Sequence, residues 1–218
     1  MVKMHYIRTS ISTLALTIFF AGCATTPVVS QRDPVSVSGV TKIVLASPEI
    51  EHIDAATGNH LLQDESIIAE LRSALATGIR SELSGKQITV LDLSEIPDVD
   101  HAALSEDLDH TYRTIKRHST ELNTSQQEQL VWISTTTHAS HLLFCRCRLY
   151  TGPDGFWNPM SGAIASGGSR IVLESHLYSM HDKKVIWTQS AQIRASPNTG
   201  ISNISTIVPL VFNTLEVE

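Results

Sequence analysis

Cys145 and Cys147, separated by one residue, are the pair in this sequence whose type and spacing are best suited to chemistry. On a strand their Cα atoms would lie about 6.6 Å apart, a distance that permits a disulfide, but nearly parallel Cβ vectors disfavour one. We therefore interpret both as buried core thiols, the form in which free cysteines survive an oxidising compartment. The alternative is a metal site that adds His138 and His141, although this spacing fits no zinc signature well.

Other patterns that would indicate catalysis are weak. The sequence contains no Gly-x-Ser-x-Gly, His-Glu-x-x-His or Walker loop. The acid pairs Asp98/Asp100 and Glu106/Asp107 lie in polar runs that are typical of a solvated face. We therefore predict no catalytic residue, no metal and no cofactor. An enzyme whose catalytic residues meet only in space is kept as an alternative.

The Gly- and Pro-rich stretch 151–169 is the longest irregular segment that we expect in the folded part of the chain. It contains Phe156, Trp157 and Met160, which we predict as candidate partner-binding residues, because exposed aromatic side chains on loops often anchor interfaces. The alternative is that Trp157 folds back onto its own sheet.

Length and composition favour one folded domain. The chain has 218 residues, of which 42% are hydrophobic and 17% charged, which suffices for a single core. With 16 Lys and Arg against 22 Asp and Glu, the net charge is −6, which disfavours a nucleic-acid binder. Three cysteines are too few for a disulfide scaffold.

The first residues have the pattern of a secretory leader. Two basic residues precede the apolar run Ile11–Phe20, which is too short to span a bilayer. The run ends in Phe20-Ala21-Gly22-Cys23, which resembles the lipobox of bacterial lipoproteins. The resemblance implies that 1–22 is a signal peptide and that Cys23 is lipidated. Because Ala24 stands where an Asp would indicate retention in the inner membrane, it also implies the outer membrane, facing the periplasm. The alternative is an ordinary secretory signal.

We expect residues 23–39 to form the lipidated N-terminus and a flexible tether, and residues 40–218 to form an α/β periplasmic domain. Apolar periodicity and turn residues predict strands at 41–46, 87–93, 141–150, 170–179 and 184–194, and helices at 64–85, 98–118, 125–139 and from 201 onward.

Single residues refine these elements. An apolar stripe is expected along the first helix, formed by Ile67, Leu71, Leu75, Ile79 and Leu83. Ser125 is the expected cap of the third helix. In the last helix, which should include Leu215, Pro209 is expected to cause a kink or an early end. Trp132 and Trp187 are both expected in the core.

The element order β-α-β-(α)-α-β-β-β-α behind a lipobox resembles a superfamily of envelope lipoproteins. That superfamily includes the curli-secretion channel protein and the outer-membrane activators of penicillin-binding proteins. The residues that carry the likeness are His138–Leu143 and the hairpin IVLESHLYSMHDKKVIWTQSAQI, although its turn, at Asp182-Lys183-Lys184, lacks the glycine that relatives often have. The resemblance implies an α/β (α+β) domain with a small mixed sheet flanked by helices.

Three functions follow from these patterns. The leading hypothesis is a non-catalytic accessory or adaptor protein, attached to the membrane by lipid, that binds another envelope protein. The second is an oligomeric subunit of a secretion channel, for which 151–169 is barely long enough to supply one membrane hairpin. The third is a periplasmic enzyme or metal-binding protein centred on the Cys/His cluster.

Overall fold

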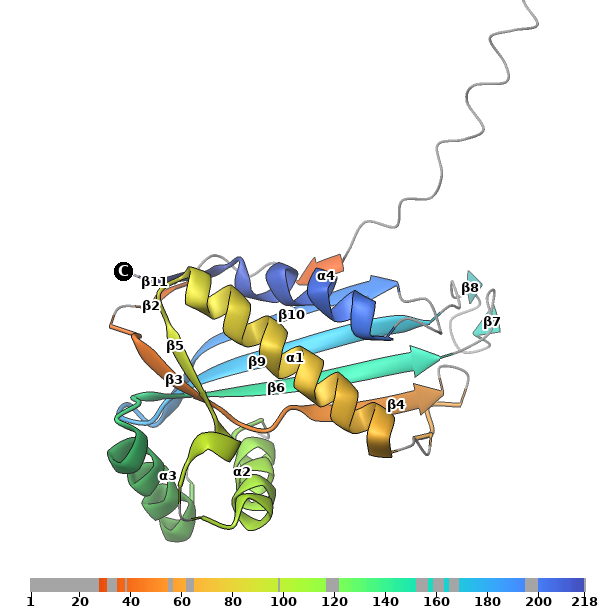
Figure 1. Cartoon of the computed structure of the whole chain (residues 1–218). Helices are drawn as coiled ribbons and strands as arrows, with labels where there is room; N and C mark the ends of the chain where they lie inside the picture. Colours follow the sequence, from red (N-terminus) through yellow and green to blue (C-terminus); the bar gives the residue numbers. More distant parts are fainter. Residues whose placement is uncertain are drawn as a thin grey trace, which may run out of the picture.

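The computed structural model describes residues 28–30, 35–37, 39–54, 57–61, 65–97, 99–116, 122–151, 157–158, 163–164, 169–194 and 200–217 (Figure 1). This part of the chain has the predicted α+β fold, with four α-helices and a seven-stranded mixed sheet. The helices are α1 (Glu65–Gly85), α2 (His101–Lys116), α3 (Thr124–Thr137) and α4 (Gly200–Phe212). None of these helices is long and apolar enough to cross a membrane.

The sheet has the strand order β1-β10-β9-β6-β3-β5, and β4 also pairs with β6. Its strands are β1 (Val28–Ser30), β3 (Lys42–Leu45), β4 (Glu49–Asp54), β5 (Thr89–Asp92), β6 (His141–Thr151), β9 (Arg170–Ser179) and β10 (Lys184–Arg194). Two small sheets join β2 (Val35–Val37) to β11 (Leu215–Val217) and β7 (Trp157–Asn158) to β8 (Ala163–Ile164). A short 3₁₀ helix, η1 (Leu93–Glu95), follows β5.

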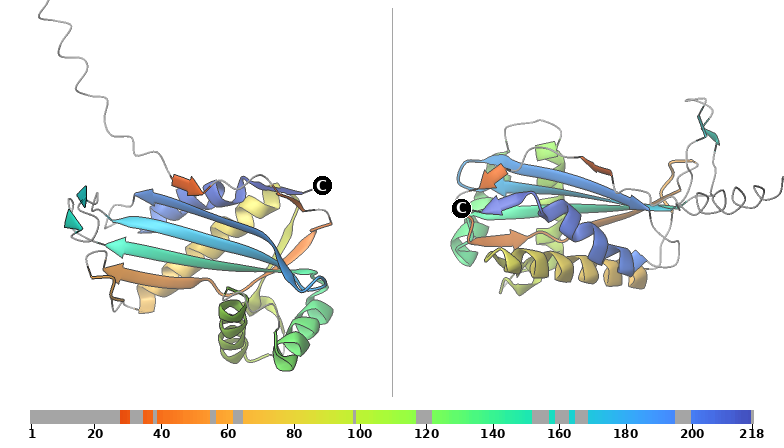
Figure 2. Two further views of the ribbon diagram at one scale, coloured as in Figure 1. Left: turned by 180° about the vertical axis from the view of Figure 1, so that it is seen from behind. Right: turned by 90° about the horizontal axis from the view of Figure 1, so that it is seen from above.

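Helices α1 and α4 cover one face of the sheet (Figures 1 and 2). The predicted stripe of α1 is buried there from Leu71 to Leu83. Ile67 is an exception with 48% of its surface exposed, because it lies in the first turn, outside the core cluster. Trp187 is buried as predicted and stacks on Phe212, with 5.5 Å between the ring centroids.

Helix α4 continues through Pro209 to Phe212. Pro209 is on the exposed side of the helix and near its end, so its missing N–H removes a single intrahelical bond where water can solvate the freed carbonyl. Leu215 was expected on this helix but lies in β11, where it pairs in parallel with Val35. The apolar spacing therefore continued past the end of α4 at Phe212 into a strand, so it did not mark the end of the helix.

Helices α2 and α3 pack on the opposite face, at one end of the sheet, and the described helices leave the rest of this face uncovered (Figure 2). Leu104, Leu108 and Tyr112 of α2 are buried against it. The cap of α3 is Asn123 rather than Ser125. The Asn123 side chain accepts a hydrogen bond from the Gln126 N–H at 2.9 Å, and the Gln126 side chain accepts one from the Asn123 N–H at 3.0 Å.

The sequence did not predict six of the strands, namely β1, β2, β4, β7, β8 and β11. β4 runs parallel to β6 and places Glu49 and Glu51 opposite Arg146 and Arg148. β1 and β2 lie within 23–39; the first pairs with β10 and the second with β11.

The hairpin between β9 and β10 turns without glycine, and Lys183 there adopts a positive φ of 53°. This left-handed conformation is unfavourable for residues that have a Cβ atom. We expect Lys183→Gly to raise the free energy of unfolding by about 0.5 kcal/mol, since the hydrogen bond from Lys183 to Gln127 is exposed and contributes little. Lys184→Gly, one residue later in β10, should lower it instead. Urea denaturation of both variants tests this difference, and the same sign for both would contradict it.

Candidate functional site

Cys145 and Cys147 are buried free thiols, as predicted. They lie on the face of β6 that packs in the core under α1 and α4. Burial raises the pKa of each thiol to about 12, so both are protonated at neutral pH and cannot act as thiolate nucleophiles. No group of three or more His, Cys, Asp or Glu side chains within the described residues could hold a metal ion.

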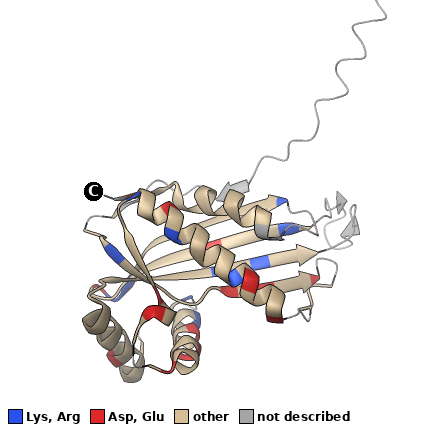
Figure 3. Ribbon diagram, in the orientation of Figure 1, with Lys and Arg blue, Asp and Glu red and all other residues tan. Residues whose placement is uncertain are grey.

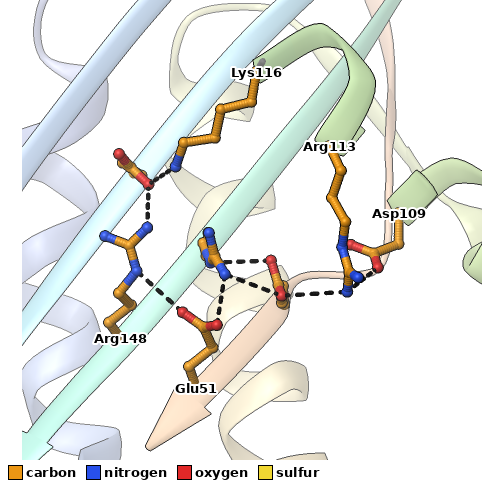
Figure 4. Close-up of polar contacts among 8 residues, drawn as sticks. Glu51, Asp109, Arg113, Lys116 and Arg148 are labelled. Carbon is orange, nitrogen blue, oxygen red and sulfur yellow. Dashed lines mark hydrogen bonds and ion pairs between the residues drawn. The ribbon is translucent and has the colours of Figure 1, made fainter. Parts of the chain in front are cut away.

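The other face of β6 carries a network of charged side chains that joins three strands to α2 (Figure 4). Figure 3 marks the Lys, Arg, Asp and Glu positions along the ribbon. The network contains four acids and four bases, namely Glu49, Glu51, Asp109, Glu174, Arg113, Lys116, Arg146 and Arg148. The network is therefore neutral as a whole. It lies where the uncovered part of the sheet meets α2.

Glu51 lies at the centre of this network. Its carboxylate accepts hydrogen bonds from Arg146 Nη2 at 2.5 Å and from Arg148 Nε at 3.0 Å, and only 12% of its side chain is exposed. Glu174 joins the sheet to α2 through Arg148 Nη2 at 3.0 Å and Lys116 Nζ at 2.8 Å. Such shared, part-buried pairs are more constrained than isolated surface pairs.

The environment separates the acids of the network by pKa. Burial alone would raise the pKa of Glu51, but hydrogen bonds from Arg146 and Arg148 outweigh it and lower the pKa. The pKa of Glu174 is lowered in the same way, through Lys116 and Arg148. Glu49 differs, because burial outweighs its attraction to Arg146 and raises its pKa. Glu51 and Glu174 are therefore the stabilising acids of the network.

A cavity of about 370 Å³ opens beside this network, between α1, α2 and the segment that links β3 to β4. Tyr112 lines it, is buried, and stacks on Phe144 with 5.1 Å between ring centroids. The hydroxyl of Tyr112 has no hydrogen-bond partner among the described residues. Burial raises the pKa of this phenol, so the hydroxyl stays protonated and can donate a hydrogen bond.

A second concave surface, the α2–α3 groove, lies between the two helices and has a volume of about 450 Å³. Nine residues line it: Val99, Asp100, Ala103, Leu104, Asp107, Ser125, Glu128, Gln129 and Trp132. Gln129 Nε2 donates to Asp107 Oδ2 at 3.2 Å and so joins the two helices. The groove combines apolar side chains with three acids.

The expectation that Trp132 belongs to the core is wrong, because 39% of its surface is exposed, as is 59% of Val131. The physical reason lies in the run Leu130-Val131-Trp132-Ile133. A helix turns 100° per residue, so a run of four apolar residues cannot face one side. Leu130 and Ile133 point into the core, which leaves Val131 and Trp132 outside. This run of four apolar residues in a helix could have indicated from the sequence that two of them are exposed.

Most residues predicted to carry the lipid or to bind a partner lie outside the described part of the chain. These are Cys23 and the leader, together with Phe156 and Met160. The backbone of Trp157 pairs with that of Ile164 between β7 and β8, and the side chain of Trp157 is outside the description. His138 ends α3 in a left-handed conformation, and His141 begins β6.

No protein-family model matches the sequence, and no curated protein matches it either. The fold is similar to a solved PelC dodecamer from Paraburkholderia phytofirmans, with 10% identity, a TM-score of 0.46 and coverage of 88% of this chain and 99% of that chain. It is also similar to the LpoB C-terminal domain from Escherichia coli, with 14% identity, a TM-score of 0.32 and coverage of 72% and 84%.

Lipoprotein GNA1162 from Neisseria meningitidis is another similar structure, with 14% identity, a TM-score of 0.31 and coverage of 72% of this chain and 83% of that chain. At such identities and TM-scores, none of these structures assigns a residue or an activity to this chain.

The charge network predicts losses of stability of different size for two nearby acids. Glu51→Gln should lower the free energy of unfolding at pH 7 by about 2 kcal/mol, because Arg146 and Arg148 each lose a charged partner. Glu49→Gln should cost less than about 1 kcal/mol, since burial already disfavours the charged form of Glu49.

The effect of Glu51 should depend on pH. Because its pKa is lower in the folded than in the unfolded chain, its contribution is complete above the unfolded value of about 4.5 and disappears as pH falls through the folded value. Denaturant unfolding followed by circular dichroism from pH 7 down to pH 3 measures this. Equal losses for the two variants at pH 7, or a loss for Glu51→Gln that does not shrink as the pH falls below about 4.5, would contradict the assignment.

Proposed function

We propose that this protein is a lipid-anchored accessory protein of the bacterial cell envelope that binds another envelope protein and catalyses no reaction. The observation that carries the proposal is a pair of exposed large apolar residues on α3: Trp132 lines the α2–α3 groove, and Val131 lies beside it. Large apolar side chains exposed at a concave surface commonly mark an interface. Tryptophan is in addition enriched among the residues that dominate binding energies.

The chemistry of the best candidate nucleophiles supports a binding role. Cys145 and Cys147 are held as protonated thiols in the core. The arginines of the charge network are compensated by acids, and its hydrogen bonds hold α2 on the sheet. These groups stabilise the fold, and among the described residues the surface of α2 and α3 stays accessible to a partner.

In the proposed protein, residues 1–22 are removed and Cys23 carries the lipid, which attaches the chain to the outer membrane on its periplasmic side. Acyl chains contribute about 0.8 kcal/mol per buried CH₂ group, so several chains suffice without a basic patch. Phe156, Trp157 and Met160 are proposed as a second partner contact on the loop.

The anchor is tested by removing its attachment point. We expect full-length Cys23→Ser to lack the acyl mass of the wild-type chain and to leave the outer-membrane fraction, because the thioether-forming sulfur is gone. The matched control, Cys147→Ala, also removes one cysteine but should keep the acyl mass and the membrane fraction. Mass spectrometry of the intact protein and density-gradient fractionation measure both. If Cys23→Ser kept the additional acyl mass, the anchor at Cys23 would be refuted.

The binding role is tested in cells by a photo-crosslinking amino acid placed in the full-length chain at Val131, at Trp157 or, as a control, at Glu70 on the exposed side of α1. We expect capture of one envelope protein from Val131 or Trp157 and not from Glu70. Mass spectrometry identifies the captured chain. Capture of further copies of this protein alone would favour the oligomeric channel subunit, and no capture from either position would refute the binding role.

A further inference from the structure

We infer that the α2–α3 groove is the docking site for a helical segment of the envelope partner, and that this segment presents an apolar side chain flanked by Lys or Arg. This inference rests on the proposed binding function and adds the chemistry of the partner. Grooves between two helices commonly accept the apolar face of a third helix.

The groove is formed by one side of each helix. At the start of α2 the lining residues recur at the spacing i, i+3, i+4 and i+7: they are Asp100, which directly precedes the helix, and Ala103, Leu104 and Asp107 on it. On α3 the same spacing recurs with Ser125, Glu128, Gln129 and Trp132. This spacing keeps each set on one side of its helix over two turns. The lining therefore follows one side of each helix for about two turns, a surface that can meet the apolar side of a helical ligand.

The two walls are held in place before a partner binds. Leu104 is buried beneath the groove, and Leu130 and Ile133 attach α3 to the same core. The hydrogen bond from Gln129 to Asp107 spans the two helices. Little conformational entropy is then lost on docking, so a short segment can bind.

Charge specifies the partner further. The lining includes three exposed acids, Asp100, Asp107 and Glu128, and no Lys or Arg. Asp100 accepts hydrogen bonds from the first backbone N–H groups of α2, and Asp107 accepts one from a neutral amide. This differs from the charge network on β6, where each acid contacts a cation. The groove is therefore a negative surface around an apolar centre, and a basic rim on the ligand complements it.

Trp132 supplies the apolar centre. Its ring lines the groove and is partly exposed to solvent, so an apolar side chain of a partner would cover it and remove that surface from water. An acidic segment would be repelled by the acids of the groove, and a wholly polar segment would not bury the ring of Trp132.

The test uses the full-length chain in cells, with the photo-crosslinking amino acid at Val131, which lies beside the groove and is not part of its lining. Asp107→Lys combined with Glu128→Lys should reduce capture of the partner by about tenfold or more, because both rim charges are reversed. Trp132→Ala should reduce it similarly. Glu70→Lys, an exposed acid on α1, is the matched control and should leave capture unchanged.

Circular dichroism melting of each purified full-length variant checks that it is folded, and for a misfolded double variant the neutral pair Asp107→Asn and Glu128→Gln takes its place. The crosslinked peptide of the partner should contain apolar residues flanked by Lys or Arg. Unchanged capture in the groove variants, an acidic crosslinked peptide, a second copy of this chain, or no capture from Val131 would each overturn the inference. If an envelope protein is still captured from Trp157, only the docking site fails and the proposed function stands.

Discussion

The two faces of β6 have opposite chemistry, and this alternation constrains the whole fold. Leu143, Cys145 and Cys147 point to one side and Arg146 and Arg148 to the other. The apolar side has to be covered, which α1 and α4 accomplish. The arginine side cannot enter an apolar core without acids beside it, since an uncompensated buried charge is far more costly than a solvated one. Glu residues on both neighbouring strands, β4 and β9, meet this requirement, and α2 packs beside them.

Helix α2 connects the sheet to the surface, because three of its sides have different partners. Leu108 and Tyr112 pack in the core, Lys116 bonds to Glu174 of the sheet, and Asp107 faces α3. Packing and ion pairs together fix the rotation of the helix about its axis. The core contacts and the ion pair to Glu174 therefore set the direction in which the groove side of α2, with Asp107, faces. In this way the charge network helps to fix the geometry of the α2–α3 groove.

Much of this fold could be predicted from periodicity. Apolar residues recur every fourth position on α1, which only a helix places on one side. They alternate along β6 and the β9–β10 hairpin, which is typical of strands. β4 could not be recognised, because Glu49-Ile50-Glu51-His52-Ile53-Asp54 has low strand propensity and becomes a strand only beside the arginines of β6, which are far away in the sequence. The charge network could not be predicted either, because its acids and arginines lie on strands that are far apart in the sequence. For the groove, the acid pairs of α2 could be placed on a solvated face, but Trp132 was expected in the core, and the pairing of α2 with α3 requires the tertiary fold.

The two tryptophans show why residue type alone does not reveal a binding surface. Trp187 lies in a strand where every second residue is buried, and Phe212 stacks on it. Trp132 lies in a helix whose core side is already occupied by Leu130 and Ile133. Its exposure would promote self-association in a protein without further features. The acids of the groove oppose this, since two copies meeting through the same surface would bring like charges together. An apolar centre within an acidic rim therefore disfavours the copy and favours a basic partner.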